Sequence, residues 1–211
     1  FNPKSIVVIG ASNDVTKPGG KILKNILDGN YQGELYVVNM KEAEVQGIKS
    51  YQDVNDLPNV DLAIIAIASK FVEDSVKVLA YRKNTKAYII LSAGFSEVGE
   101  QGKIIEDNVV RIINETNGAL IGPNCIGVLT PYYNGIFTLP IPQLDSKGCD
   151  FITGSGATAV FILESAIPKG LKFASLFSVG NSAQIGVEEL LEYLDNSFDA
   201  NSSRIKLLYL E

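Results

Sequence analysis

SIVVIGASNDVTKPGG, residues 5–20, is the stretch of this 211-residue sequence that decides the fold. Residues 5–9 are mostly β-branched and predict a strand, while Ile22, Leu23, Ile26 and Leu27 recur with helical spacing just beyond the stretch. The loop between them is rich in small residues. Open α/β folds place a phosphate at such a strand–loop–helix junction, against free backbone N–H groups. The stretch therefore predicts a parallel α/β sheet and an anionic ligand at its first loop.

The alternation of strands and helices continues along the chain. Short Val- and Ile-rich runs without polar alternation predict strands buried on both faces at residues 5–9, 35–38, 62–67, 88–91 and 119–121. Helical periodicity predicts helices at 21–27, 72–82 and 103–116. A proline-marked stretch over 130–147 reads as a crossing connection. Beyond it, the pattern predicts strands at 149–153, 173–178 and 205–210, with helices at 157–166 and 187–194.

We therefore predict an α/β protein with a first domain over residues 1–129, a connection over 130–147 and a second domain over 148–211. The three strands and two helices of the second domain are few for a closed core, so this domain looks truncated.

Composition excludes several classes of function. The formal net charge is −6 without a basic block, which argues against nucleic acid as a partner. No stretch approaches the roughly 18 apolar residues of a membrane span, and no signal peptide is visible, so we expect a cytoplasmic protein. Two cysteines and no histidine predict no metal site. The lack of histidine also removes the commonest general base and phospho-acceptor.

The first two loops do not fit a dinucleotide site. A dinucleotide fingerprint requires glycine at the positions of Ser12 and Val15, and an acidic residue after the second strand. That strand is followed instead by Asn39, Met40 and Lys41. A lysine there favours an extra phosphate, such as the one on the ribose of CoA or of NADP. A solvated lysine on a turn explains Lys41 equally well.

Two later loops fall where the ligand crevice of such a sheet lies. Residues 92–97 follow the fourth predicted strand and residues 122–125 follow the fifth, both at carboxyl ends. Turn chemistry alone also explains their Gly, Pro and Asn residues.

The ordered set of motifs resembles the NDP-forming acyl-CoA synthetases. The motifs are Asn-Pro-Lys-Ser at 2–5, Ile-Gly-Ala-Ser at 9–12, Val-Asn-x-Lys at 38–41, Ser-Ala-Gly-Phe-x-Glu at 92–97, Gly-Pro-Asn-Cys-x-Gly at 122–127, Ser-Gly-Ala at 155–157, Gly-Asn at 180–181 and Leu-Tyr-Leu-Glu at 208–211. That family includes the ADP-forming acetyl-CoA synthetases and is related to the α subunit of succinyl-CoA synthetase. The resemblance spans the whole chain and implies a CoA-binding Rossmann-like domain followed by an incomplete flavodoxin-like domain.

The resemblance also implies roles for individual residues. The first loop would hold the CoA diphosphate or pantetheine region, Lys41 would face the adenosine phosphates, and the later loops would line the path of the thiol arm. The cofactor-binding residues implied in this way are Gly10, Ser12, Lys17, Lys41, Ser92, Gly94, Glu97, Asn124 and Cys125.

For catalysis, the resemblance implies a phosphate loop at Ser155 and Gly156, although a plain helix cap by Ser155 explains the same residues. It implies that Glu211 orients a catalytic histidine, which this chain does not contain. Three residues of this sequence differ from the family pattern: Met40 and Ala68 stand in place of proline, and Gly154 replaces a polar residue of the phosphate loop.

The implied reaction interconverts acyl-CoA, phosphate and NDP with a carboxylic acid, CoA and NTP, through an acyl phosphate and a phosphohistidine. CoA and phosphate would bind this chain, whereas NDP or NTP with Mg would bind an ATP-grasp domain or subunit outside it, in a homo- or hetero-oligomer. Two alternatives stay open at this point: an NAD(P)-binding oxidoreductase-like domain that uses Lys41 for NADP, and a non-catalytic CoA sensor or acetyltransferase-associated domain.

Overall fold

The first sheet of the computed structural model, which describes residues 2–210, has seven strands in the order β3-β4-β2-β1-β5-β6-β7. Their bounds are β1 Ser5–Ile9, β2 Glu34–Val38, β3 Glu44–Val45, β4 Ile48–Tyr51, β5 Leu62–Ile65, β6 Ala87–Ile90 and β7 Ala119–Ile121. β1 pairs in parallel with both β2 and β5, so the strand order reverses there. Ligands of open α/β sheets bind beside the carboxyl ends of strands at such a switch point.

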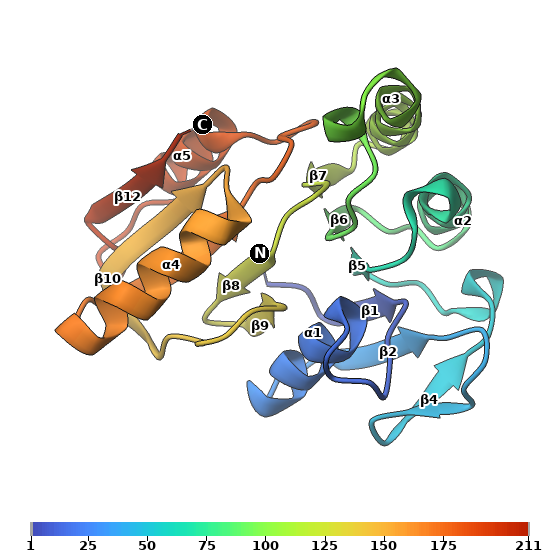
Figure 1. The fold of residues 1–211 in the computed structure, drawn as a ribbon, viewed down its shortest axis with the longest axis horizontal. Coiled ribbons are helices and arrows are strands. Elements are labelled where there is room, and N and C mark those ends of the chain that lie inside the picture. The colour runs from blue at the N-terminus through green and yellow to red at the C-terminus, as the bar shows by residue number, and fades with distance from the viewer. Residues whose placement is uncertain (1, 211) are drawn as a thin grey trace.

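Helices cover both faces of this sheet. Figure 1 shows α2 and α3 on one side and α1 on the other. Their bounds are α1 Pro18–Asp28, α2 Val72–Arg82 and α3 Glu100–Glu115, with short 3₁₀ turns η1 Val54–Asp56, η2 Ser69–Phe71 and η3 Ser96–Val98. Because side chains alternate along a strand, Val7 and Ile9 pack in the cluster that holds α2 and α3, and Ile6 and Val8 pack in the cluster that holds α1.

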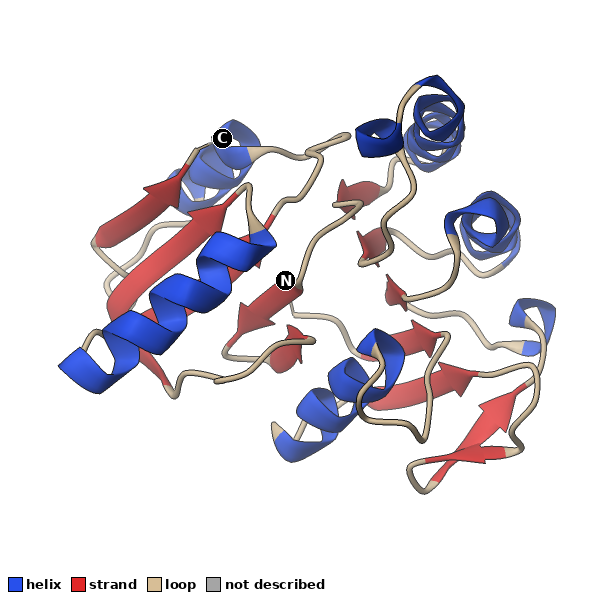
Figure 2. Cartoon of the chain, in the orientation of Figure 1, coloured by secondary structure: helices blue, strands red, loops and turns tan. Residues whose placement is uncertain are grey.

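The second sheet has the order β12-β10-β11-β8-β9 within residues 2–210. Its elements are β8 Gly127–Thr130, β9 Tyr133–Ile136, β10 Leu144–Thr153, α4 Gly156–Ala166, η4 Ile167–Lys169, β11 Phe173–Ser178, α5 Val187–Asn196 and β12 Ile205–Tyr209. β10 pairs in parallel with β11 and β12, whereas β8 is antiparallel to β11 and to β9. In Figure 2 the strands form two groups, and α4 lies across the second one.

The three strands predicted for residues 148–211 are present as β10, β11 and β12, but the sheet that contains them also includes earlier residues that the sequence did not assign to it. The hairpin β8–β9 adds two antiparallel strands, because Val128 and Leu129 pair with β11. The predicted connection over 130–147 therefore contains β9 and the first residues of β10. The hairpin β3–β4 was also missed, since its strands are two and four residues long. The domain limits at 129 and 148 stay a prediction.

The two sheets share one apolar core. A single cluster of buried side chains contains Leu23 and Ile64 from the first sheet and its helix, together with Phe177 and Leu190 from β11 and α5. Burial of a side chain of this size contributes about 2 kcal/mol. The two sheets and the loops between them are therefore held together by ordinary core packing. No helix within residues 2–210 is long and apolar enough to span a membrane.

Candidate functional site

The loop between β1 and α1 is a close backbone contact that only glycine allows. Gly10 has φ +84°, and its N–H donates to Val38 O at 3.0 Å. A Cβ on Gly19 would lie 1.9 Å from Gly10 O. Helix α1 begins at Pro18 without a side-chain cap from Lys17, so the positive end of its dipole faces the loop. This geometry suits a phosphate.

Two amide side chains to which sequence reasoning gave no role hold this loop in place. Asn39 donates from Nδ2 to Ala11 O at 2.8 Å and accepts the N–H of Lys41 at 2.8 Å. Gln46 donates from Nε2 to Ser12 O at 2.8 Å. The first loop is therefore braced by the segment that carries Lys41. Asn39 lay within a quoted motif, whereas nothing in the sequence marks Gln46.

The predicted ligand residues of this region are partly engaged. Ser12 Oγ accepts the N–H of Asp14 at 3.0 Å, which leaves its hydroxyl hydrogen available. Lys17 Nζ lies 3.6 Å from Asp14 Oδ2, and both side chains are exposed. The pKa of Asp14 is lowered, chiefly by hydrogen bonds from the Thr16 hydroxyl and backbone N–H. Lys41 is exposed at the end of the same edge. Lys17 is therefore shared with Asp14, whereas Lys41 has no ion pair within residues 2–210.

The loop after β6 is organised around the Glu97 carboxylate. That carboxylate accepts the N–H groups of Gly94 at 2.5 Å and Phe95 at 3.2 Å. Burial alone would raise the pKa of Glu97, but hydrogen bonds from Asn181 and from Gly94 and Phe95 outweigh it and the pKa is lowered. Gly94 has φ +101°, and the Ser92 hydroxyl donates to Ile67 O. The Glu97 carboxylate therefore fixes the backbone conformation of its own loop.

The loop after β7 carries Asn124 and Cys125. The Asn124 N–H donates to Ser92 O at 2.9 Å, which joins this loop to the one after β6. The Cys125 side chain is 3% exposed, and its thiol donates to Ile90 O at 3.3 Å. Burial raises the pKa of Cys125 to about 12, so the thiol is neutral at pH 7. Buried, protonated thiols of this kind are poor nucleophiles.

The predicted phosphate loop begins α4. Ser155 Oγ accepts the N–H of Thr158 at 3.4 Å, and Ser155 O accepts that of Ala159 at 3.0 Å. The N–H groups of Gly156 and Ala157 have no partner within the helix, as is general for a first turn. A Cβ on Gly156 would lie 2.6 Å from Ile126 Cγ2. The capping role and an anion-binding role of Ser155 are therefore compatible.

A cavity of about 400 Å³ joins these two regions. We call it the carboxyl-edge cavity, because its walls follow the carboxyl ends of β6, β7, β10 and β11. The lining residues are Leu91, Asn124, Cys125, Ile126, Phe137, Gly154, Ser155, Gly156, Ala157, Gly180 and Asn181. The structure thus brings the predicted end of the thiol arm to the predicted phosphate loop.

The remaining predicted residues lie elsewhere. Seven of them, in the loops after β1, β2 and β6, are not in the walls of the cavity: Gly10, Ser12, Lys17, Lys41, Ser92, Gly94 and Glu97. Glu211 lies outside the described residues. Within residues 2–210 no group of acidic, Cys or His side chains is arranged to hold a metal ion.

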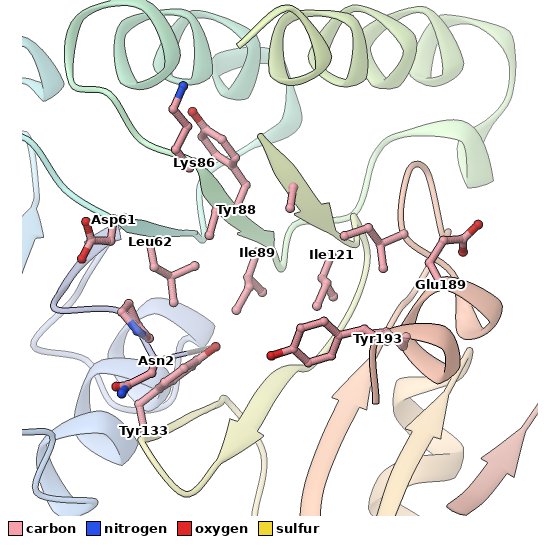
Figure 3. A pocket seen from close by; sticks show the side chains of 15 residues that line it. Asn2, Asp61, Leu62, Lys86, Tyr88, Ile89, Ile121, Tyr133, Glu189 and Tyr193 are labelled. Atoms are coloured by element: carbon pink, nitrogen blue, oxygen red, sulfur yellow. The ribbon is translucent and has the colours of Figure 1, made fainter. Parts of the chain in front are cut away.

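A second cavity, of about 450 Å³, opens at the opposite edge of the first sheet. Figure 3 shows Leu62, Ile89 and Ile121 above it, with the rings of Tyr133 and Tyr193 approaching from two sides. Asp61 and Lys86 stand before β5 and β6, so we call it the amino-edge cavity. Its walls are mainly apolar side chains, and sequence reasoning did not foresee it.

Comparison with known proteins matches both parts of the chain. A family model described as "CoA binding domain" matches residues 4–131, and one described as "Succinyl-CoA ligase like flavodoxin domain" matches residues 146–211.

Individual relatives match the full length of the chain. The α subunit of acetate–CoA ligase [ADP-forming] II from Pyrococcus furiosus is 39% identical over 100% of this chain and 45% of its own length. A trans-feruloyl-CoA synthase from an unknown prokaryotic organism is 35% identical over 100% of this chain and 30% of its own length. The solved dinucleotide-forming acetyl-coenzyme A synthetase 1 of Ca. Korarchaeum cryptofilum, in complex with phosphate and ADP, is 32% identical with a TM-score of 0.90, over 100% of this chain and 44% of that chain. The chain therefore spans less than half the length of each of these proteins.

Proposed function

The chain belongs to the CoA-binding domain family and is similar to the first part of the ADP-forming acetate–CoA ligases, and we propose that it binds CoA and phosphate for an acyl-CoA synthetase reaction. The observation that carries this proposal is the carboxyl-edge cavity, where Asn124 and Cys125 face Ser155 and Gly156. A thiol held by the first pair and a phosphate held by the second would share one site.

The residues present fit CoA. A diphosphate would lie at the first loop, where Gly10 and Gly19 allow close backbone approach and α1 presents its positive end. Lys41 would meet the phosphates of the adenosine part. The Asn39 carboxamide donates to Ala11 O and accepts the N–H of Lys41. It is therefore not available to bind a ribose hydroxyl, as the acidic residue of an NAD site does at this position. This difference favours CoA over a dinucleotide.

CoA would supply the thiol that accepts or releases the acyl group. The residues of this chain contribute position and charge stabilisation. The N–H groups of Gly156 and Ala157 and the Ser155 hydroxyl would donate to the phosphate at the positive end of α4. Cys125 stays protonated and confines the thiol arm by its shape alone. Bringing two reactants into one cavity lowers the entropic part of the barrier.

The phosphohistidine step needs residues that this chain does not have. The chain contains no histidine. We propose that a histidine from further sequence or another subunit reaches the carboxyl-edge cavity, oriented by Glu211, and that an ATP-grasp domain or subunit supplies the nucleotide with Mg. We propose a carboxylic acid as the substrate that is joined to CoA. The names of the relatives give different acids, since one is an acetate–CoA ligase and another a trans-feruloyl-CoA synthase.

The test is calorimetric titration with CoA, with NADP as a second ligand, in phosphate-free buffer. We expect saturable binding of CoA and none of NADP. Lys41→Ala should weaken CoA binding by about tenfold, since a lysine–phosphate contact contributes about 1.5 kcal/mol. Lys169→Ala, which removes the same charge from an exposed site in η4, should leave it unchanged. Binding of NADP in place of CoA would contradict the proposal.

A further inference from the structure

The motif Gly180-Asn181 has no role in the proposed function so far. Its loop, which follows β11 in the second sheet, contacts the loop that follows β7 in the first sheet. The Asn181 N–H donates to Pro123 O at 2.9 Å, and the Ala183 N–H donates to Gly122 O at 3.2 Å. A Cβ on Gly180 would lie 2.1 Å from Pro123 O. The loop after β11 therefore lies directly on the loop after β7.

The carboxamide of Asn181 contacts four side chains from the segments that follow β6 and β7. Nδ2 donates to Glu97 Oε2 at 2.6 Å, to Glu106 Oε2 at 3.0 Å and to Ser96 Oγ at 3.1 Å. Oδ1 accepts from Asn124 Nδ2 at 3.3 Å. Asn181 also lines the carboxyl-edge cavity. One residue thus connects the loop after β6, the loop after β7 and the wall of the phosphate site.

An uncharged amide suits this position better than other side chains of its size. Glu106 is 6% exposed, and a buried carboxylate needs donors. The amide donates to both Glu97 and Glu106 without adding charge, and its oxygen is left for Asn124. Glu97 in turn holds the N–H groups of Gly94 and Phe95. A displacement of Asn181 would therefore move both loops that face the thiol arm.

We propose that Asn181 is a positioning residue for CoA: it fixes the loop of Gly94 to Glu97 and the side chain of Asn124 against the phosphate loop. This inference rests on the proposed function. Asn181 acts through Glu97 and Asn124, and it sets how tightly the thiol arm is held at the cavity.

The test measures CoA affinity in wild type, Asn181→Ala and Asn181→Asp, with Gln184→Ala as the matched control. Gln184 is an amide of the same loop that contacts β7 and α3: it accepts the Leu120 N–H at 2.5 Å and donates to Asn114 Oδ1 at 2.5 Å. It does not line the cavity. At pH 7.5 both Asn181 variants should bind CoA about tenfold more weakly, because hydrogen bonds to charged groups are lost. Gln184→Ala should bind it as wild type does, and thermal unfolding of each variant identifies any that fails to fold.

A pH readout separates positioning from loss of structure. The charged groups near position 181 are Glu97 on η3 and Glu106 on α3, with Lys103 one turn earlier on α3. An aspartate introduced beside two carboxylates has a raised pKa and gains an O–H donor as the pH falls. Asn181→Asp should therefore recover much of its CoA affinity at pH 5.5, whereas Asn181→Ala should not.

The outcomes distinguish this inference from its premise. Wild-type binding of CoA with unchanged affinity in both Asn181 variants would overturn the inference alone. An equal loss in Gln184→Ala would do the same, because any loosening of the two units would then suffice. Failure of the wild type to bind CoA would overturn the proposed function and this inference together.

Discussion

The two cavities at opposite edges of the first sheet have similar volumes, about 400 Å³ at the carboxyl edge and about 450 Å³ at the amino edge, but different walls. The carboxyl-edge cavity is bounded by loops in which glycines bring backbone close to backbone. The amino-edge cavity is bounded by apolar side chains of β5 to β7 and by Tyr133 and Tyr193 (Figure 3). Volume alone would not choose between them. The first turn of α4 does, because its N–H groups at Gly156 and Ala157 have no partner within the helix and an anionic ligand needs such donors.

The comparison also separates two kinds of residue. At the carboxyl edge, Gly180 and Gly156 are needed because a Cβ would meet the neighbouring loop at 2.1 Å and 2.6 Å. At the amino edge, Leu190 and Tyr133 are 1% and 3% exposed and hold the sheets together by packing. Changes at the first edge should therefore alter ligand binding, and changes at the second should alter stability alone.

The largest expected effect comes from Gly180→Ala. Its Cβ would lie 2.1 Å from Pro123 O, and φ is +55°. Overpacking and an unfavourable backbone together should lower the free energy of unfolding by about 4 kcal/mol. Gly170→Ala is the matched control, since Gly170 has φ +85° but nothing within 4 Å of an added Cβ. It should cost about 1 kcal/mol. Urea unfolding of both variants measures the difference, and equal losses would show that the loops are not in contact.

Leu190→Ala tests the amino edge. Leu190 belongs to the shared core, so its truncation should lower the free energy of unfolding by about 3 kcal/mol while CoA affinity stays at the wild-type value. Leu171→Ala, at a side chain that is 43% exposed, should cost less than about 0.5 kcal/mol. Unfolding curves and CoA titrations on the same samples check both statements. A marked loss of CoA affinity in folded Leu190→Ala would mean that the amino edge contributes to the site.

Most of the parallel framework could be predicted from the sequence, because buried parallel strands are continuous apolar runs. β1, β7 and α2 begin and end at the predicted residues. Glycine and proline marked the site loops, since backbone conformation restricts the residue type there. α1 begins at Pro18, three residues before its predicted start, because its first turn holds no apolar side chain except that proline.

What could not be predicted depends on pairing between distant segments. The hairpin β8–β9 becomes part of a sheet only through β11, almost fifty residues later in the chain. In the sequence, Asn181 belonged to the Gly-Asn motif without an assigned role and Gln184 was an unmarked polar residue; only the fold shows that they contact Glu97 and β7. The Glu97 carboxylate, expected along the thiol arm, is bound by its own loop and by Asn181, which no local pattern encodes.

Ser155→Ala sharpens the carboxyl-edge side of the comparison. Loss of the cap to Thr158 should lower the free energy of unfolding by about 1 kcal/mol, and loss of a hydroxyl donor should weaken phosphate binding by about tenfold. Asp53→Ala removes a comparable cap, to the Asn55 N–H at 2.8 Å, far from the cavity. It should lower stability without affecting phosphate. Phosphate titration followed by ³¹P NMR provides the measurement, and equal phosphate affinity in Ser155→Ala would reduce Ser155 to a helix cap.

The smallest expected effect is the pH dependence due to Glu97. Its pKa lies below the ordinary 4.5, so its contribution to stability is present above pH 4.5 and is lost as the pH falls through the lowered pKa. In Glu97→Gln that contribution is missing at neutral pH, and the stability curves of variant and wild type should converge below pH 4.5. The side chain is largely exposed, so solvent screens the effect and keeps it small.

Glu192→Gln, which removes one exposed negative charge from α5, should show no such convergence. Parallel curves for Glu97→Gln and wild type down to pH 3 would mean that the hydrogen bonds from Gly94, Phe95 and Asn181 do not favour the ionised form of Glu97. The charge of Glu97 would then not hold the loops of the carboxyl edge in place, and this difference from the amino edge would disappear.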